Sequence, residues 1–182
     1  MIKAAVFFAD GFEEVEALTV VDLLRRANFQ VSMVSITEDL SVTGSHNITV
    51  KADLPITKLA FNEQDLFVLP GGMPGTTNLA SCQKLCEELP VQSSRGKLIA
   101  AICAAPTVLG QLGLLQGKKA CCYPGMEGGL PFAKPTTLPV TKDANIITSR
   151  GVGTAIPFAL SIIEELEGKE FSDKLAKSIV YQ

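Results

Sequence analysis

Short apolar runs alternate with longer amphipathic stretches along the whole chain. Five runs have the apolar, β-branched composition of buried strands, and they cover residues 4–9, 30–36, 66–69, 98–102 and 146–148. Five stretches have helical periodicity or helix-start signals, and they cover residues 13–27, 83–93, 106–111, 154–167 and 171–179. This alternation predicts an α/β fold in which a mostly parallel sheet is covered by helices on both faces.

Two further segments break the alternation. Residues 42–50 are typical of a hairpin or short strand around Gly44-Ser45. Residues 118–140 contain seven of the chain's prolines and glycines and are expected to be irregular. We find no internal repeat, linker or shift in composition, so residues 1–182 are expected to form a single domain.

The composition excludes several classes of protein. Hydrophobic residues make up 47% and charged residues 19% of the 182 positions, with a net charge of −3. This is a core-rich globular composition without the basic surface that nucleic acids or anionic membranes attract. The apolar runs are too short to span a membrane, and Asp10 and Glu13-Glu14 end the first run too early for a signal peptide.

The cysteines indicate a reducing compartment. There are five, at positions 82, 86, 103, 121 and 122, and an odd number suits no disulfide framework. We therefore expect a cytoplasmic protein. With one histidine and no CxxC pair, no zinc or other metal site is expected.

Cys103 is the candidate nucleophile. It directly follows the apolar run at 98–102, and Ala104-Ala105-Pro106 then opens a helix. A helix N-terminus favours the thiolate over the thiol, and the strand–turn–helix pattern is similar to the nucleophile elbow of serine hydrolases. The alternative is an inert buried thiol at the end of a strand.

Other turns are expected to converge on the same edge of the sheet. In parallel sheets, sites lie beyond the carboxyl ends of the strands, and residues 10–16, 70–75, 103–106 and 149–153 all follow predicted strands. The N–H groups of Gly71, Gly72 and Ala104 could stabilise an oxyanion, although a Gly-Gly pair is also typical of a plain tight turn. Glu16 could hydrogen-bond the sulfur and act as general acid or base, whereas Glu13 and Glu14 suit a helix N-terminus.

His46 is the only histidine, and it lies in the polar segment Thr43-Gly44-Ser45-His46-Asn47. A cysteine–histidine mechanism would use it as the base. Its polar surroundings favour a solvent-exposed loop position instead.

Five ordered segments together resemble the ThiJ/PfpI superfamily, and within it the clade that includes a parkinsonism-associated protein. They are residues 11–17, 21–26, 68–72, 100–107 and 148–155, and the resemblance extends over nearly the whole chain. It implies a flavodoxin-like three-layer sandwich and a homodimer. It places Cys103 at the family's nucleophile, Glu16 at the glutamate that hydrogen-bonds the sulfur, and Gly71-Gly72 at the oxyanion turn. Tyr123, Arg26, His46 and Gly153 become candidate pocket residues.

Some members of the family have a histidine close to the cysteine, where this chain has Tyr123 in Cys121-Cys122-Tyr123-Pro124. A phenol does not readily act as a base at neutral pH, which weakens a protease mechanism and assigns the proton transfers to Glu16. His46 falls where members of the clade have an arginine, and we expect it to line the pocket of a partner subunit.

The resemblance implies a cofactor-free glyoxalase or deglycase that acts on methylglyoxal-type 2-oxoaldehydes or their adducts, in stress defence. The alternative is a redox-sensing or chaperone-like stress protein in which Cys103 oxidises to a sulfinate. A role in thiazole biosynthesis is not inferred. A nucleotide binder is disfavoured, because Pro70-Gly71-Gly72-Met73-Pro74-Gly75 matches neither GxGxxG nor GxxxxGK[ST].

Overall fold

A seven-stranded sheet forms the centre of the computed structural model, which describes residues 1–182. In spatial order its strands are β10 (Val140–Asp143), β11 (Ile146–Ser149), β7 (Leu98–Ile102), β6 (Leu66–Leu69), β1 (Lys3–Phe8), β2 (Gln30–Ser35) and β5 (Leu54–Pro55). All neighbours are parallel except β10 and β11. The mostly parallel sheet expected from the sequence is therefore confirmed.

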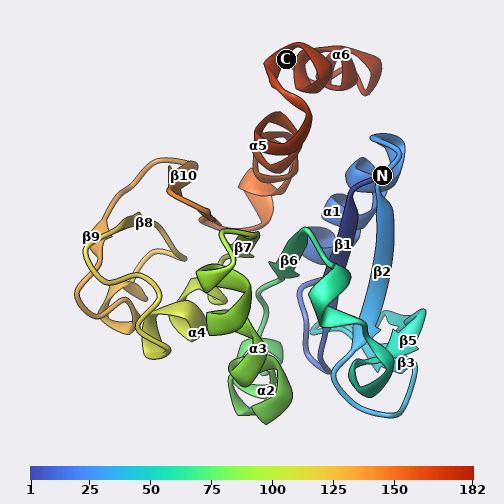
Figure 1. Ribbon diagram of the computed structural model, residues 1–182, viewed down its shortest axis with the longest axis vertical. Coiled ribbons are helices and arrows are strands. Elements are labelled where there is room, and N and C mark those ends of the chain that lie inside the picture. The colour runs from blue at the N-terminus through green and yellow to red at the C-terminus, as the bar shows by residue number, and fades with distance from the viewer.

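Helices cover both faces of the sheet. α1 (Glu14–Arg26), α5 (Ala155–Glu167) and α6 (Lys169–Ser178) lie on one side, and α2 (Gly75–Ser81), α3 (Gln83–Ser94) and α4 (Pro106–Gln111) on the other (Figure 1). Side chains of β1 alternate between the two layers: Val6 and Phe8 belong to a core cluster of 25 residues, and Ala5 and Phe7 to one of 22. These two apolar layers fix the strands whose ends build the site.

Smaller elements complete the chain. A hairpin of β3 (Ser41–Thr43) and β4 (Thr49–Lys51) packs beside the start of α1, and β8 (Lys119–Ala120) pairs with β9 (Lys134–Pro135). Short 3-10 helices cover Ile56–Lys58, Phe61–Glu63, Glu127–Gly129 and Val152–Thr154. The sequence pattern did not predict α2, β5 or β10.

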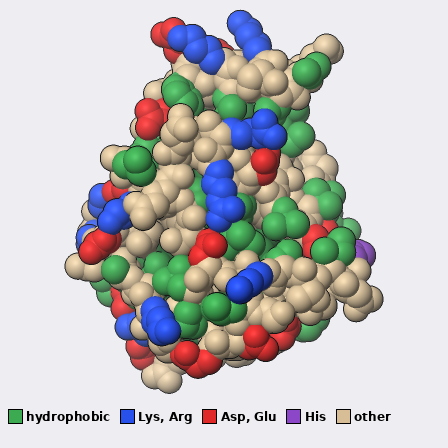
Figure 2. Space-filling view, turned by 90° about the vertical axis from the view of Figure 1, so that its right-hand side faces the viewer, with side chains coloured by type: hydrophobic (Ala, Val, Ile, Leu, Met, Phe, Trp, Pro, Cys, Tyr) green, Lys and Arg blue, Asp and Glu red, His purple; other side chains and the backbone are tan.

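Acidic and basic side chains are interspersed over the face shown in Figure 2, consistent with the small net charge of −3. None of the helices combines the length and the apolar character that a bilayer crossing requires.

Candidate active site

The turns that follow four strands converge on one cavity at the carboxyl edge of the sheet. The cavity has a volume of about 780 Å³. Glu13 and Glu16 reach it after β1, Gly72 after β6, Cys103 after β7, and Arg150 to Thr154 after β11. The convergence that the sequence predicted is present in the structure.

Cys103 occupies a strained turn between β7 and α4. Its backbone φ of 64° lies in the left-handed region, which residues other than glycine rarely adopt. Its N–H donates to the Ser149 carbonyl at 3.0 Å, and its carbonyl accepts the Tyr123 N–H at 2.7 Å. Contacts on both sides therefore hold the turn, and the half-buried thiol is presented to the cavity.

Gly71 packs directly against the two reactive side chains. A Cβ atom at this position would lie 2.5 Å from the Cβ of Cys103 and 2.7 Å from Glu16 Oε2. The Gly71 N–H donates to Glu16 Oε2 at 2.9 Å, so it is not free to bind an oxyanion. This corrects the sequence-based expectation for Gly71. The N–H groups of Gly72 and Ala104 lie beside the Cys103 sulfur instead, where they lower its pKa.

Glu16 is fully buried and has an unusual protonation equilibrium. Burial outweighs the Gly71 hydrogen bond and raises the pKa of its carboxyl from 4.5 to about 7. Its Oε1 atom has no hydrogen-bond partner and lies 3.9 Å from where a Cβ of Gly151 would be, on the wall of the cavity. Close to neutral pH, Glu16 can therefore hold a proton or release it.

Cys103 and Glu16 are neighbours across Gly71, and the ionisation of one affects the pKa of the other. Burial, followed by the charge of the Glu16 carboxylate, raises the pKa of Cys103 from 9.0 to about 12, contrary to the lowered pKa that the helix N-terminus led us to expect. The pair consequently loses one proton near pH 7 and keeps the other. The sulfur holds the remaining proton, and the Gly72 and Ala104 N–H groups partly offset the rise in its pKa.

A second pair of interacting side chains, the Glu14 carboxylate and the His46 imidazole, lies at the rim of the cavity. Glu14, only 3% exposed, accepts the His46 backbone N–H at 2.8 Å through Oε1 and bonds His46 Nδ1 at 2.9 Å through Oε2. Burial opposes the charge of Glu14, but these hydrogen bonds lower the pKa of its carboxyl to about 2. Gly44 makes the approach possible, because a Cβ there would lie 2.3 Å from the Glu14 carboxyl carbon.

This pair was not predicted from the sequence. The residues lie 32 positions apart, and the only signal was that an acidic turn and a polar hairpin each adjoin the expected edge of the sheet. Together with Glu13, the two residues offer ligand atoms within 4.8 Å of one another, the one group of this kind that could hold a metal ion.

The structure places three further candidate residues around the same cavity as Cys103. Tyr123, 52% exposed, His46 and Gly153 all line it. His46 thus borders the cavity of its own chain, while its expected contact with a partner subunit stays a prediction. Arg26 is not part of the site: it lies at the far end of α1, where its Nε donates to Asp22 at 2.6 Å.

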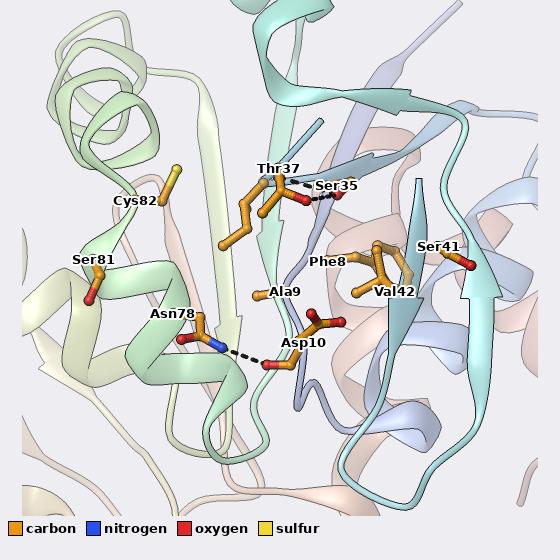
Figure 3. Close-up of a pocket in the computed structure, with 11 residues that line it drawn as sticks. Phe8, Ala9, Asp10, Ser35, Thr37, Ser41, Val42, Asn78, Ser81 and Cys82 are labelled. Atoms are coloured by element: carbon orange, nitrogen blue, oxygen red, sulfur yellow. Dashed lines mark hydrogen bonds between the residues drawn. The ribbon is translucent and has the colours of Figure 1, made fainter. Parts of the chain in front are cut away.

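Another cavity, of about 410 Å³, lies beyond the ends of β1 and β2 and contains Cys82 (Figure 3). Most of its polar groups already have partners: Asn78 Nδ2 donates to the Asp10 carbonyl at 2.8 Å, and Ser35 Oγ donates to the Asp39 carbonyl at 2.6 Å. Asp10 is the only charged residue that lines this cavity. The cavity around Cys103 combines a strained thiol, a carboxyl that titrates near neutrality and free N–H donors, and is therefore the candidate active site.

Comparison with known proteins assigns the chain to a family. Residues 2–165 match the family described as DJ-1/PfpI. The protein dj-1beta of Drosophila melanogaster is 40% identical over 180 residues, which cover 98% of this chain and 96% of that protein. A Caenorhabditis elegans relative named glutathione-independent glyoxalase DJR-1.2 is 36% identical over 92% of this chain and 89% of its own length. The solved structure of oxidized Toxoplasma gondii DJ-1 superposes with a TM-score of 0.94, at 39% identity, and covers 100% of this chain and 99% of that one.

The Toxoplasma structure confirms the flavodoxin-like arrangement of sheet and helices, and the family match extends over all the turns that build the cavity. The chain therefore belongs to the DJ-1/PfpI family.

Proposed function

We propose that the protein is a cofactor-free glyoxalase that converts methylglyoxal-type 2-oxoaldehydes to 2-hydroxy acids, and that it also acts on their adducts. The observation that carries this proposal is the Cys103–Glu16 pair, which loses a single proton near pH 7 beside two N–H donors. The glyoxalase name of the Caenorhabditis elegans relative supports the same activity.

The first half of the reaction uses Cys103 and Glu16. The Glu16 carboxylate takes the thiol proton as the sulfur adds to the aldehyde carbon, and it then passes this proton to the new alkoxide. The Gly72 and Ala104 N–H groups lie beside the sulfur, where charge develops on the adduct. The resulting Glu16 carboxylate then removes the proton from the former aldehyde carbon and delivers it to the adjacent carbon. The hydroxyl proton moves from the oxygen on the first carbon to the oxygen on the second, which leaves a 2-hydroxy acyl thioester on Cys103.

The test is lactate formation from methylglyoxal by metal-free protein without glutathione. Wild type is expected to turn over, and Cys103→Ser and Glu16→Gln to lose at least about 10²-fold in kcat/KM. Equal rates for wild type and Cys103→Ser would refute the proposal.

A second proposed role is redox sensing, supported by the name of the oxidized Toxoplasma structure and by the half-buried sulfur beside the Gly72 and Ala104 N–H groups. Hydrogen peroxide would convert the thiolate to a sulfenate and then a sulfinate, with each step transferring one oxygen to sulfur and releasing water. Intact-protein mass spectrometry after mild peroxide treatment is expected to show two added oxygens, all on Cys103. Equal oxidation of Cys82, which lines the other cavity, would argue against a dedicated sensor.

A further inference from the structure

The thioester formed on Cys103 must be hydrolysed, and this step needs a base that Glu16 does not provide. Glu16 is fully buried and its Oε2 atom already accepts the Gly71 N–H, so it does not reach a water molecule at the rim of the cavity. Among the other polar groups on the cavity wall, the Arg150 guanidinium offers only hydrogen-bond donors and the Tyr123 phenol is a poor base. The remaining candidate bases are Glu13 and His46, which lie beside each other at the rim.

The orientation of the His46 ring is set by Glu14. A carboxylate can only accept, so the 2.9 Å contact places a proton on His46 Nδ1 and leaves Nε2 with a free lone pair in the neutral ring. Glu14 is itself fixed, because its other oxygen receives the backbone N–H groups of His46 at 2.8 Å and Ile48 at 3.4 Å. A buried carboxylate that orients an exposed imidazole is the arrangement by which hydrolases prepare a general base.

From this geometry we propose that His46 is the general base for hydrolysis of the Cys103 thioester and that Glu14 is its positioning residue. The inference rests on the proposed glyoxalase function. Nε2 takes a proton from a water molecule at the rim while the water oxygen bonds to the thioester carbon. The tetrahedral adduct then breaks its C–S bond, and the electron pair returns to the Cys103 sulfur beside the Glu16 carboxyl. Because the His46 side chain is 67% exposed, the imidazolium loses its proton directly to solvent.

The charges around His46 determine how the step depends on pH. The ring faces Glu14 and Glu13 from α1 and Ser45 from its own turn, and Arg150 lies on the opposite wall of the cavity. The hydrogen bond to Glu14, together with the charges of Glu13 and Glu14, raises the pKa of His46 above 6.5. Hydrolysis is therefore expected to accelerate as the pH rises through a value above 6.5.

Single-turnover reactions with methylglyoxal separate the two half-reactions. In wild type, acid quenching and intact-protein mass spectrometry should show a short-lived acyl group on Cys103 that disappears as lactate appears. In His46→Gln, the acyl group should form at the wild-type rate and persist, with release slowed roughly 10²-fold. Added imidazole should restore release in His46→Ala.

The matched control is Lys51→Gln, which removes an exposed cation from the same hairpin and should release lactate like wild type. Glu14→Gln should shift the pH midpoint of release downward, a change that a purely structural role would not produce. If His46→Gln released lactate at the wild-type rate, the inference would fail while the glyoxalase proposal stood. If wild type formed neither acyl enzyme nor lactate, both would fail.

Discussion

At the scale of single residues, the main feature of the site is the coupled ionisation of Cys103 and Glu16. The local sequence made both residues candidates, because a strand that ends in Cys-Ala-Ala-Pro predicts an elbow and Glu16 follows an acidic turn at the same edge, but it left an inert buried thiol as the alternative. It could not predict the direction of the thiol pKa shift. That direction depends on the burial of both groups and on a carboxylate 87 positions away in the sequence, which only the packed structure brings next to the sulfur.

This coupling predicts the pH dependence of thiol reactivity. Burial and the Glu16 carboxylate raise the pKa of Cys103 to about 12, so alkylation of the wild-type thiol by iodoacetamide should be slow at neutral pH and should increase toward that pH. In Glu16→Gln the carboxylate that raises the thiol pKa is absent, so the midpoint should fall below the wild-type value, while burial keeps it above 9. Peptide mapping separates Cys103 from the other four cysteines. An unchanged midpoint in Glu16→Gln would show that the Glu16 charge does not raise the thiol pKa.

The left-handed backbone of Cys103 predicts an order of stability between two inactive variants. Alanine retains the steric cost of φ 64°, whereas glycine does not, so Cys103→Gly should be more stable to urea than Cys103→Ala by about 1 kcal/mol. Both variants lack the sulfur atom of Cys103, so the difference in their stability reports the backbone strain and not the loss of the thiol. The opposite order would mean that the turn is not strained.

At the scale of elements, the site depends on how the start of α1 is connected to the β3–β4 hairpin. Glu14 makes this connection through hydrogen bonds to the backbone and ring of His46, and Gly44 leaves the space for its carboxylate. Periodicity predicted the helix and the hairpin separately, but it carries no information on contacts between side chains 32 positions apart.

The sequence pattern did not predict helix α2, and the reason is again that the helix depends on tertiary contacts. Its sequence, Gly-Thr-Thr-Asn-Leu-Ala-Ser, is poor in helix formers, so local propensity gave no signal. The buried Leu79 side chain joins the core cluster beneath α3 and α4, and this tertiary packing is what stabilises the helix.

The Glu14 connection predicts a specific loss of stability in Glu14→Gln. A carboxylate whose pKa is lowered to about 2 stabilises the fold above its ordinary pKa of 4.5, and that contribution disappears as the pH falls toward 2. At pH 7 the variant should lose about 1–3 kcal/mol of unfolding free energy. Its stability should also fall less steeply than that of wild type between pH 4.5 and 2. Parallel curves would show that Glu14 does not hold the hairpin through its charge.

At the scale of the whole molecule, the buried Glu16 carboxyl of the candidate active site reduces the stability of the fold above pH 4.5. Glu16 prefers its neutral form in the folded state, so the free energy of unfolding should decrease as the pH rises from 4.5 to about 7. Glu16→Gln removes this dependence. The variant should therefore exceed wild type by up to about 3 kcal/mol at pH 8 in guanidinium denaturation, and the difference should shrink below pH 4.5. A variant less stable than wild type at pH 8 would contradict the raised pKa.

Some expectations concern surroundings that a single chain does not contain. The homodimer, the contact of His46 with a partner subunit, and the small 2-oxoaldehyde or glycated substrate stay predictions. Light scattering during size-exclusion chromatography would test the dimer directly.

The order of the strands also affects how copies of this protein can associate. At one edge of the sheet lies β5, only two residues long, whose Pro55 has no N–H to offer a further strand. At the other edge, β10 is short and antiparallel and carries Lys142, which is paired with Glu165 of α5. Both margins thus disfavour the strand-by-strand growth that leads to fibrils, so even at high concentration the sheets of neighbouring molecules have little tendency to join into aggregates.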